Sequence, residues 1–293
     1  MSNGWRTIVV DNHTKLGLMQ GYMTVRQGNE QRKVIIEEIY ALIIESTAVS
    51  LTAALLAALI KAKVKVIFCD ESHVPHSELV SYYGAHDSSR KFRTQIKWDR
   101  HAKEVVWTAI IQEKIRKQSQ FLKRLGKEQH KQLEAYQETV HHADATNREG
   151  QAAKVYFAAL FGLDFSRNSD CAINAALNYG YSILMAAFSR EITACGYSTQ
   201  LGIGHDSVFN HFNLVSDLME PYRPLVDALV YEMKPEVFGK DEKRVILSML
   251  DQTVLLNDKK QIVKNAIRLY CQSVFDAIEE NDASLIRFYE NEL

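Results

Sequence analysis

The spacing of apolar residues along the first seventy positions is typical of short β-strands. Four segments with β-branched or alternating apolar residues are separated by turns rich in Asn, Gly and Gln, and they predict strands at 6–11, 17–26, 32–37 and 41–46. Ser50 is placed to cap a helix over 50–62, and another strand is predicted at 65–70. The pattern predicts a small, mostly β domain with one helix.

From about Arg90 onward, apolar residues recur at every third or fourth position, which is typical of amphipathic helices. This spacing predicts helices at 105–125, 131–143, 150–162, 170–192, 214–233 and 259–280. Three of the four prolines, Pro221, Pro224 and Pro235, mark an interruption or an end in this part. We therefore predict an α+β protein with a small N-terminal β-rich domain at 1–75, a linker at 76–89 and a larger all-α domain at 90–293.

The composition, with 46% hydrophobic and 24% charged residues, is ordinary for a globular protein. No segment has the roughly 18 consecutive apolar residues that a membrane span requires, so no membrane association is expected. The N-terminal residues lack the basic stretch and apolar core of a secretory signal. The four cysteines form no CxxC pair and are expected to be reduced core thiols, which indicates a cytoplasmic protein.

Charge is distributed unevenly although the net charge is only −1. The segment 88–131 holds 13 Lys/Arg against 4 Asp/Glu, whereas the segment 276–293 holds six acidic residues and one basic residue, Arg287. A basic stripe is the charge pattern expected for contacts with nucleic-acid phosphates. The alternative interpretation is a solvated helix face.

The segment 202–224 carries the residues best suited to chemistry. His205 lies in a glycine-flanked loop, an amphipathic helix follows, and Glu220 stands directly before Pro221, with Arg223 close behind. An imidazole and a carboxylate that converge in this way suit a divalent metal that also binds an anion. Such a site needs another ligand, and Glu149 is the best candidate.

Each of these residues has a simpler interpretation. Glu149 stands three residues after Thr146 at the start of a helix, which is a capping-box pattern. A single histidine such as His205 is more often structural than a ligand. Asp217 precedes Glu220 by three residues and shares its helix face, so spacing does not settle which carboxylate reaches a metal. We expect Glu220 to be the ligand.

Two asparagines, Asn174 and Asn178, stand one turn apart on an otherwise apolar predicted helix. Buried amides need hydrogen-bond partners, so these two either link core helices or support a nearby polar site. The chain has no GxxxxGKS, GxSxG or HExxH motif. The pairs His141–His142 and His73–His76 lack zinc-like neighbours and are expected at the surface.

Glu149 before a helix, the run NAALNYGYSIL at 174–184, the glycine-flanked His205 and the run SDLMEPYRP at 216–224 together resemble the CRISPR-associated integrase family. Two proteins are found wherever CRISPR arrays acquire spacers, and members of this family are the larger of the two. The resemblance covers essentially the whole chain. The length and the segment CDESHVPHSEL at 69–79 resemble its type II branch.

Carried over to this sequence, the resemblance implies that Glu149, His205 and Glu220 are the catalytic metal ligands. Many family members have Asp at the last position and a second carboxylate one turn earlier, which here is Asp217. The implied metal is Mg²⁺ or Mn²⁺, because oxygen ligands with one imidazole suit the harder ions. Asp217, Asn174 and Asn178 are then candidates for supporting this site.

The resemblance also implies a reaction and partners. In a transesterification, the 3′-hydroxyl of a short spacer duplex attacks a phosphodiester at the end of a CRISPR repeat. Family members act as homodimers, two of which are bridged by a dimer of a small ferredoxin-like protein into a heterohexamer. The basic segment would follow the backbone of double-stranded DNA, with phosphate contacts from Arg90, Lys91, Arg93, Lys97 and Arg100.

Two other functions fit the same residues. A metal-dependent endonuclease acting on branched DNA would use the same three ligands with water as the nucleophile. A non-catalytic DNA-binding scaffold would need no such triad, although the nearly neutral net charge favours it slightly.

Overall fold

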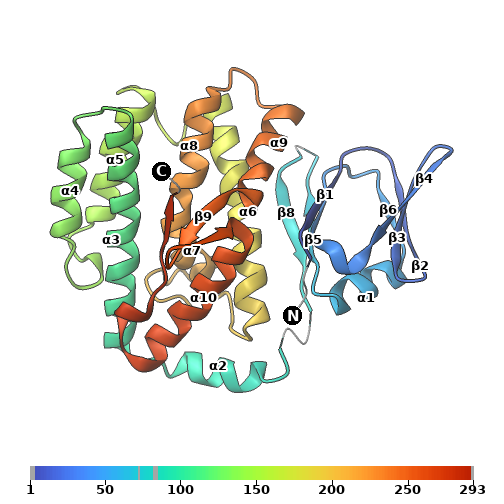
Figure 1. The fold of residues 1–293 in the computed structure, drawn as a ribbon, viewed down its shortest axis with the longest axis horizontal. Helices are drawn as coiled ribbons and strands as arrows, with labels where there is room; N and C mark the ends of the chain where they lie inside the picture. The colour runs from blue at the N-terminus through green and yellow to red at the C-terminus, as the bar shows by residue number, and fades with distance from the viewer. Residues whose placement is uncertain (1–3, 72, 82–84, 292–293) are drawn as a thin grey trace. The chain divides into compact units, whose positions relative to one another are not determined.

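The computed structural model describes residues 4–71, 73–81 and 85–291. The chain divides into two compact units, Met1–His86 and Asp87–Leu293 (Figure 1). The first unit is rich in strands and the second is mostly helical, which confirms the predicted α+β class. Within the described ranges, no helix has both the length and the apolar character needed to cross a bilayer.

In its described residues, the first unit contains two four-stranded sheets, one α-helix and one short 3₁₀ helix. Its elements are β1 (Arg6–Val10), β2 (Lys15–Met19), β3 (Tyr22–Gln27), β4 (Glu30–Ile35), η1 (Ile36–Glu38), β5 (Ile39–Ile44), β6 (Ser50–Leu51), α1 (Ala53–Lys61), β7 (Lys65–Cys69) and β8 (Pro75–Leu79). The strand orders are β1-β5-β7-β8 and β4-β3-β2-β6. Strand β5 is buried at every position, as expected of a strand that pairs in parallel on both edges.

Three details of this unit differ from the sequence prediction. The single strand predicted at 17–26 is a hairpin, because Gln20 and Gly21 both adopt positive φ and turn the chain between β2 and β3. Thr52, not Ser50, caps α1 by accepting from the N–H of Leu55. Strand β8 pairs with β7, so the start of the segment 76–89 belongs to a sheet and not to a linker.

The second unit is built around the helices α3 and α6, the longest in the part of the chain that the structure describes (Figure 1). Its elements are α2 (Ser88–Ile96), α3 (Arg100–Arg124), α4 (His130–Glu138), η2 (His142–Asp144), α5 (Arg148–Phe161), α6 (Ala172–Ala194), α7 (Asn213–Met219), η3 (Glu220–Tyr222), α8 (Arg223–Met233), α9 (Lys240–Ser248), η4 (Met249–Asp251), β9 (Thr253–Leu256), β10 (Lys259–Ile262), α10 (Val263–Glu280), η5 (Ala283–Leu285) and β11 (Tyr289–Asn291). Helix α3 packs against α4, α5, η3, α8 and α10, and helix α6 packs against α7, α8, α9 and α10. This arrangement brings α3, α5 and η3 together.

The sequence predicted an all-α domain at 90–293, but the second unit also contains strands. Strands β9, β10 and β11 form a small antiparallel sheet in the order β10-β9-β11. Asn257 and Asp258 both adopt positive φ between β9 and β10, which is the backbone of a tight hairpin turn. The helix predicted at 259–280 therefore begins only at Val263.

Prolines divide the helix predicted at 214–233, as expected. Helix α7 ends at Met219, Pro221 lies in the 3₁₀ turn η3, and Pro224 is at the start of α8. Glu220 is therefore the first residue of a short turn between two helices, and its side chain is buried.

Candidate functional site

Glu149 does not cap its own helix. The N-cap of α5 is Asn147, which accepts from the N–H of Gly150 at 3.2 Å. The carboxylate of Asp144 accepts from the N–H of Glu149 at 2.9 Å. These side chains satisfy the first amides of the helix, so the capping box predicted from Thr146 and Glu149 does not form. The Glu149 carboxylate is left to pair elsewhere.

Its partner is Lys114, which lies on α3. Lys114 Nζ donates to Oε1 of Glu149 at 2.6 Å and lies 2.5 Å from Oε2 of Glu220. The ammonium thus joins two carboxylates that come from different elements, α5 and η3. Arg223 Nε donates to the other Glu220 oxygen, Oε1, at 2.9 Å. Oε2 of Glu220 is buried and receives no hydrogen bond of ordinary geometry in the described structure.

The charges in this cluster stabilise one another in a buried setting. Burial opposes the charged form of Glu220, but Arg223 and Lys114 outweigh it, so the pKa of Glu220 is lowered. Burial also opposes the charged form of Lys114, and Glu220 and Glu149 outweigh it, so the pKa of Lys114 is raised. The buried carboxylate of Glu220 is therefore held in its ionised form.

Asp217 has a different role from Glu220, although both were ligand candidates. Its fully buried carboxylate accepts from the backbone N–H groups of Ile203, Gly204 and His205 at 2.6, 3.1 and 2.9 Å. It also meets Nδ1 of His205 at 2.6 Å. All of these contacts go to the loop before α7, so Asp217 fixes the position of that loop and of its histidine.

Close packing explains why glycine stands at positions 202 and 204 of the loop. A Cβ on Gly202 would lie 2.2 Å from the carbonyl oxygen of His205, and a Cβ on Gly204 would lie 2.3 Å from the Trp107 ring. The His205 ring packs edge-on against Trp107, with centroids 5.5 Å apart. Only glycine allows the backbone to pass this close to Trp107 and Asp217.

His205 is partly exposed to solvent, with 41% of its side chain accessible. The hydrogen bond with Asp217 raises its pKa, burial opposes that effect, and the charges of Asp217, Glu220 and Glu149 add to it. Because an ionised carboxylate only accepts hydrogen bonds, Nδ1 carries the hydrogen and Nε2 is the nitrogen left to bind a metal or take up a proton.

The donor set fits a hard divalent cation. Glu149 and Glu220 supply carboxylate oxygens that already converge on one cation, the Lys114 ammonium, and His205 supplies one imidazole nitrogen. In the arrangement described, no three Asp, Glu, His or Cys side chains anywhere in 4–71, 73–81 or 85–291 approach closely enough to hold a metal ion. The ammonium occupies the place between the two glutamates.

Asn174 and Asn178 hold a loop near α6. Asn174 Nδ2 donates to the carbonyl oxygens of Ser166 and Ser169 at 2.8 and 2.7 Å, and its Oδ1 accepts from Arg167. Arg167 also donates to Oδ1 of Asn178 at 2.7 Å. Both asparagines therefore anchor the segment between α5 and α6, and their hydrogen bonds do not reach the carboxylate cluster.

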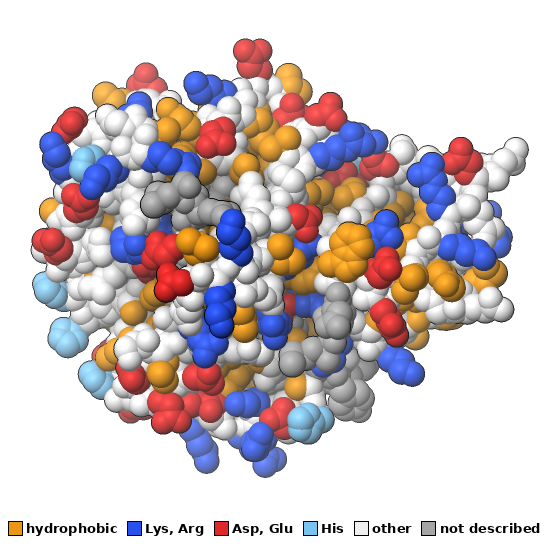
Figure 2. All heavy atoms as spheres, viewed as in Figure 1, with side chains coloured by type: hydrophobic (Ala, Val, Ile, Leu, Met, Phe, Trp, Pro, Cys, Tyr) orange, Lys and Arg blue, Asp and Glu red, His pale blue; other side chains and the backbone are white. Residues whose placement is uncertain are grey.

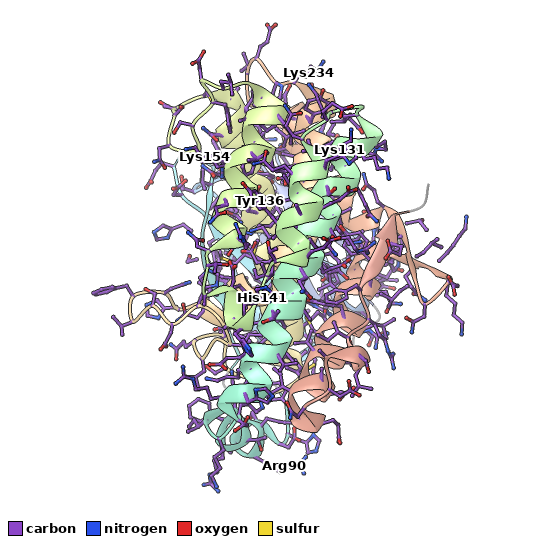
Figure 3. All side chains as sticks on the ribbon, turned by 90° about the vertical axis from the view of Figure 1, so that its left-hand side faces the viewer. Arg90, Lys131, Tyr136, His141, Lys154 and Lys234 are labelled. Atoms are coloured by element: carbon purple, nitrogen blue, oxygen red, sulfur yellow. The ribbon has the colours of Figure 1, made fainter. Side chains whose placement is uncertain are left out.

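The five predicted phosphate contacts lie on α2, directly after it and at the start of α3. Arg90, Arg93, Lys97 and Arg100 are exposed. Lys91 instead donates to the hydroxyl of Tyr197 and pairs with Glu279 at 3.0 Å. Arg90 and Lys131 lie at opposite ends of the helical unit in Figure 3, and basic and acidic side chains are interspersed over the face of that unit in Figure 2. Lys114 and Lys117 of the segment 88–131 are moreover buried, so its basic residues do not form one continuous surface patch.

Sequence reasoning missed Lys114. It shares a helix face with Trp107, Ile110 and Ile111, all buried, and only 8% of its own side chain is exposed. Lys114 follows these three apolar residues by seven, four and three positions, so the sequence already placed it on the buried face of the helix. A buried ammonium requires anionic partners, and this spacing could therefore have indicated a cluster of charges.

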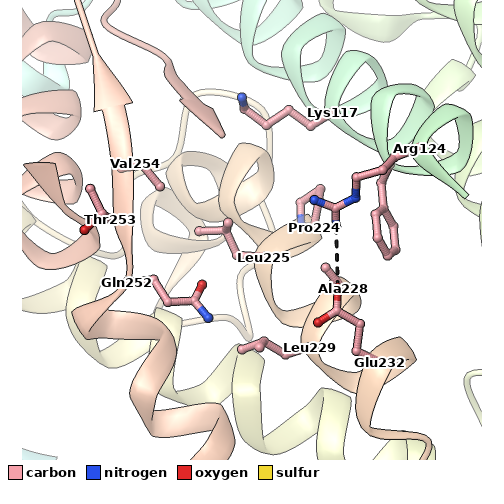
Figure 4. A pocket seen from close by; sticks show the side chains of 11 residues that line it. Lys117, Arg124, Pro224, Leu225, Ala228, Leu229, Glu232, Gln252, Thr253 and Val254 are labelled. Atoms are coloured by element: carbon pink, nitrogen blue, oxygen red, sulfur yellow. Dashed lines mark ion pairs between the residues drawn. The ribbon is translucent and has the colours of Figure 1, made fainter. Parts of the chain in front are cut away.

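A cavity of about 200 Å³ lies elsewhere in this unit, among α3, α8 and β9 (Figure 4). Arg124 and Glu232 form an ion pair of 3.6 Å across it, and Leu225, Leu229 and Val254 supply apolar walls. Glu149, His205 and Glu220 do not line it.

The fold and site together define an α+β protein whose helical unit carries a buried carboxylate cluster beside a half-exposed histidine. Residues 7–259 match the model of the family described as CRISPR associated protein Cas1. The chain belongs to this family.

Similar proteins support the assignment. A CRISPR-associated endonuclease Cas1 from Neisseria meningitidis is 36% identical over 230 residues, covering 78% of this chain and 76% of the relative. One from Francisella tularensis subsp. novicida is 27% identical, covering 86% and 89%.

Solved structures show the same fold. A casposase bound to integration product has a TM-score of 0.78 and 19% identity, covering 94% of this chain and 91% of that one. A Cas6-RT-Cas1–Cas2 complex also has a TM-score of 0.78, at 17% identity. This chain is covered in full and spans 37% of that chain.

Proposed function

We propose that this chain is a metal-dependent DNA integrase of CRISPR adaptation, of the type II branch. It joins the 3′-hydroxyl ends of a short spacer duplex to a CRISPR repeat. The observation that carries the proposal is the convergence of Glu149 and Glu220 on one cation position, with His205 in their electrostatic field. Membership of the Cas1 family supports it, as does the fold shared with a casposase bound to integration product.

The residues have separate roles in this proposal. Glu149, Glu220 and Nε2 of His205 hold Mg²⁺ or Mn²⁺, which when bound supplies a Lewis acid for the phosphodiester. Asp217 keeps the imidazole oriented through Nδ1. Arg223 balances the charge of Glu220 and fixes the direction of its carboxylate.

DNA and protein partners complete the proposal. Phosphates of double-stranded DNA in the cytoplasm are contacted by the exposed residues Arg90, Arg93, Lys97 and Arg100. Lys91 instead fixes α2 in place through its hydrogen bond to the hydroxyl of Tyr197. Two homodimers of the chain assemble with a small ferredoxin-like protein into a heterohexamer. The fold shared with a solved Cas6-RT-Cas1–Cas2 complex supports a second protein partner.

An endonuclease acting on branched DNA is the second candidate. Relatives bearing the name CRISPR-associated endonuclease Cas1 favour it, and it would use the same ligands with water as the nucleophile. A non-catalytic scaffold is the third candidate, and it predicts that the three ligand side chains are dispensable.

One experiment separates the three. The protein and its small partner are incubated with Mn²⁺, a repeat-containing plasmid and an end-labelled duplex. We expect label joined covalently to the plasmid, complete loss of joining with EDTA, and recovery with added Mn²⁺. We expect Glu149→Ala and His205→Ala to abolish joining, whereas the exposed Glu138→Ala serves as the control and leaves it intact. Cleavage without joining would establish the endonuclease, and joining by the alanine variants would establish the scaffold.

A further inference from the structure

We propose that Lys114 is a built-in counter-ion of the metal site. Its ammonium holds Glu149 and Glu220 together in the metal-free protein and competes with the divalent cation for their oxygens. Lys114 is thus a positioning residue that holds the two carboxylates together and weakens metal binding. This inference rests on the function proposed above.

The contacts of Lys114 are those of an internal cation. Its Nζ lies 2.6 Å from Oε1 of Glu149 and 2.5 Å from Oε2 of Glu220, and 8% of its side chain is exposed. Burying an ammonium is unfavourable unless anions compensate. Here the two compensating anions are the two predicted carboxylate ligands, so the lysine is directed at the site itself.

Removing the ammonium would leave the buried Glu220 carboxylate and the partly exposed Glu149 carboxylate facing one another without the cation between them. Arg223 would remain, but it pairs with the opposite oxygen of Glu220. A divalent cation brings two positive charges to the same oxygens and is repelled by the ammonium beside them. The same substitution should therefore destabilise the metal-free protein and strengthen metal binding.

The chain contains a matched control on the same helix. Lys117 is one turn further along α3, and 1% of its side chain is exposed. It pairs with Glu113 at 3.2 Å and donates to the carbonyl oxygen of Tyr289. Replacing it removes another buried lysine of the same helix without touching a predicted metal ligand.

The test compares Lys114→Met, Lys114→Arg, Lys117→Met and the unchanged full chain. Thermal unfolding is followed in EDTA and across a Mn²⁺ titration, and the dissociation constant for Mn²⁺ is measured by calorimetry. We expect Lys114→Met to melt below the unchanged chain in EDTA, to regain most of that loss with Mn²⁺, and to bind Mn²⁺ at least about tenfold more tightly. Lys117→Met should lose stability with and without Mn²⁺ at an unchanged dissociation constant. Lys114→Arg should retain metal-free stability.

Equal or weaker Mn²⁺ binding by Lys114→Met would overturn the inference, as would a stability loss that Mn²⁺ does not recover. Lys114→Gln, which keeps a polar end, is measured in parallel and decides the result if the methionine variant does not fold. Failure of the unchanged chain to bind Mn²⁺, or binding that Glu149→Ala leaves unaffected, would instead overturn the proposed metal site and this inference with it.

Discussion

Asp217 and Glu220 show how two similar residues acquire different surroundings. Both are buried carboxylates, three positions apart. Asp217 is still within α7 and faces three backbone N–H groups of the His205 loop. Glu220 falls in the 3₁₀ turn after α7 ends, and it faces Lys114 and Arg223. Because α7 ends between them, Asp217 binds the backbone of a loop, whereas Glu220 faces cationic side chains.

At this scale we predict that Asp217→Asn loosens the loop without removing a metal ligand. Replacing one carboxylate oxygen by NH₂ sets a donor against N–H donors, so the free energy of unfolding should fall by about 2 kcal/mol. Urea unfolding measures this loss. Calorimetry with Mn²⁺ should show binding retained in Asp217→Asn and lost in Glu220→Gln. Equal loss of binding in both variants would make Asp217 a ligand and contradict the proposed assignment.

At the scale of elements, the loop before α7 depends on close packing against α3. Gly204 lies against the ring of Trp107, which also packs edge-on against His205. The carboxylate of Asp217 holds the loop through its backbone N–H groups. The loop thus contacts both a helix surface and a buried anion, and the position of the imidazole follows from both.

We expect Gly204→Ala to displace the loop because the added methyl would lie 2.3 Å from the Trp107 ring. Joining activity should fall at least about tenfold, since small displacements of a catalytic group are costly. The thermal midpoint should fall by only a few degrees, roughly what a local defect costs. The double variant Gly204→Ala/Trp107→Leu relieves the overlap and should recover part of the activity. No recovery would point to another cause.

At the scale of the whole molecule, an excess of basic residues in a segment does not predict a basic surface patch. The segment 88–131 has a strong basic excess, yet Lys114 and Lys117 are buried in ion pairs and Lys91 is engaged with Glu279. The exposed Arg90, Arg93, Lys97 and Arg100 lie on α2, directly after it and at the start of α3. Figure 3 shows Arg90 at one end of the helical unit. DNA contacts are expected there, and not along the full length of α3.

We predict that Arg93→Glu combined with Lys97→Glu weakens binding of duplex DNA and flattens its salt dependence. If both side chains neutralise phosphates, the slope of log affinity against log salt should lose about two units. Fluorescence anisotropy at several salt concentrations measures it. Lys259→Glu combined with Lys260→Glu makes the same change in net charge on exposed residues of β10 and is the control. Equal weakening by both pairs would show a general effect of charge.

The sequence by itself determined the class of fold and most helices, because periodic burial leaves a periodic pattern of apolar residues. It also identified His205, Glu149 and Glu220 as candidates from their residue types and local motifs. It failed at β9 and β10, because strands of four residues are too short to show an alternation of apolar and polar residues that differs from the pattern of the helix that follows. The strand β8 was missed because its side chains are polar at most positions.

Only the tertiary structure decided how the candidate side chains meet. Packing of α3 against α5 and η3 places Lys114 between Glu149 and Glu220, and no local pattern encodes a contact between side chains so distant along the chain. Packing also assigned Asp217 to the loop, since its partners are backbone N–H groups that spacing does not reveal. Residue types are local properties of a sequence, whereas the pairing of charges depends on which elements the core brings together.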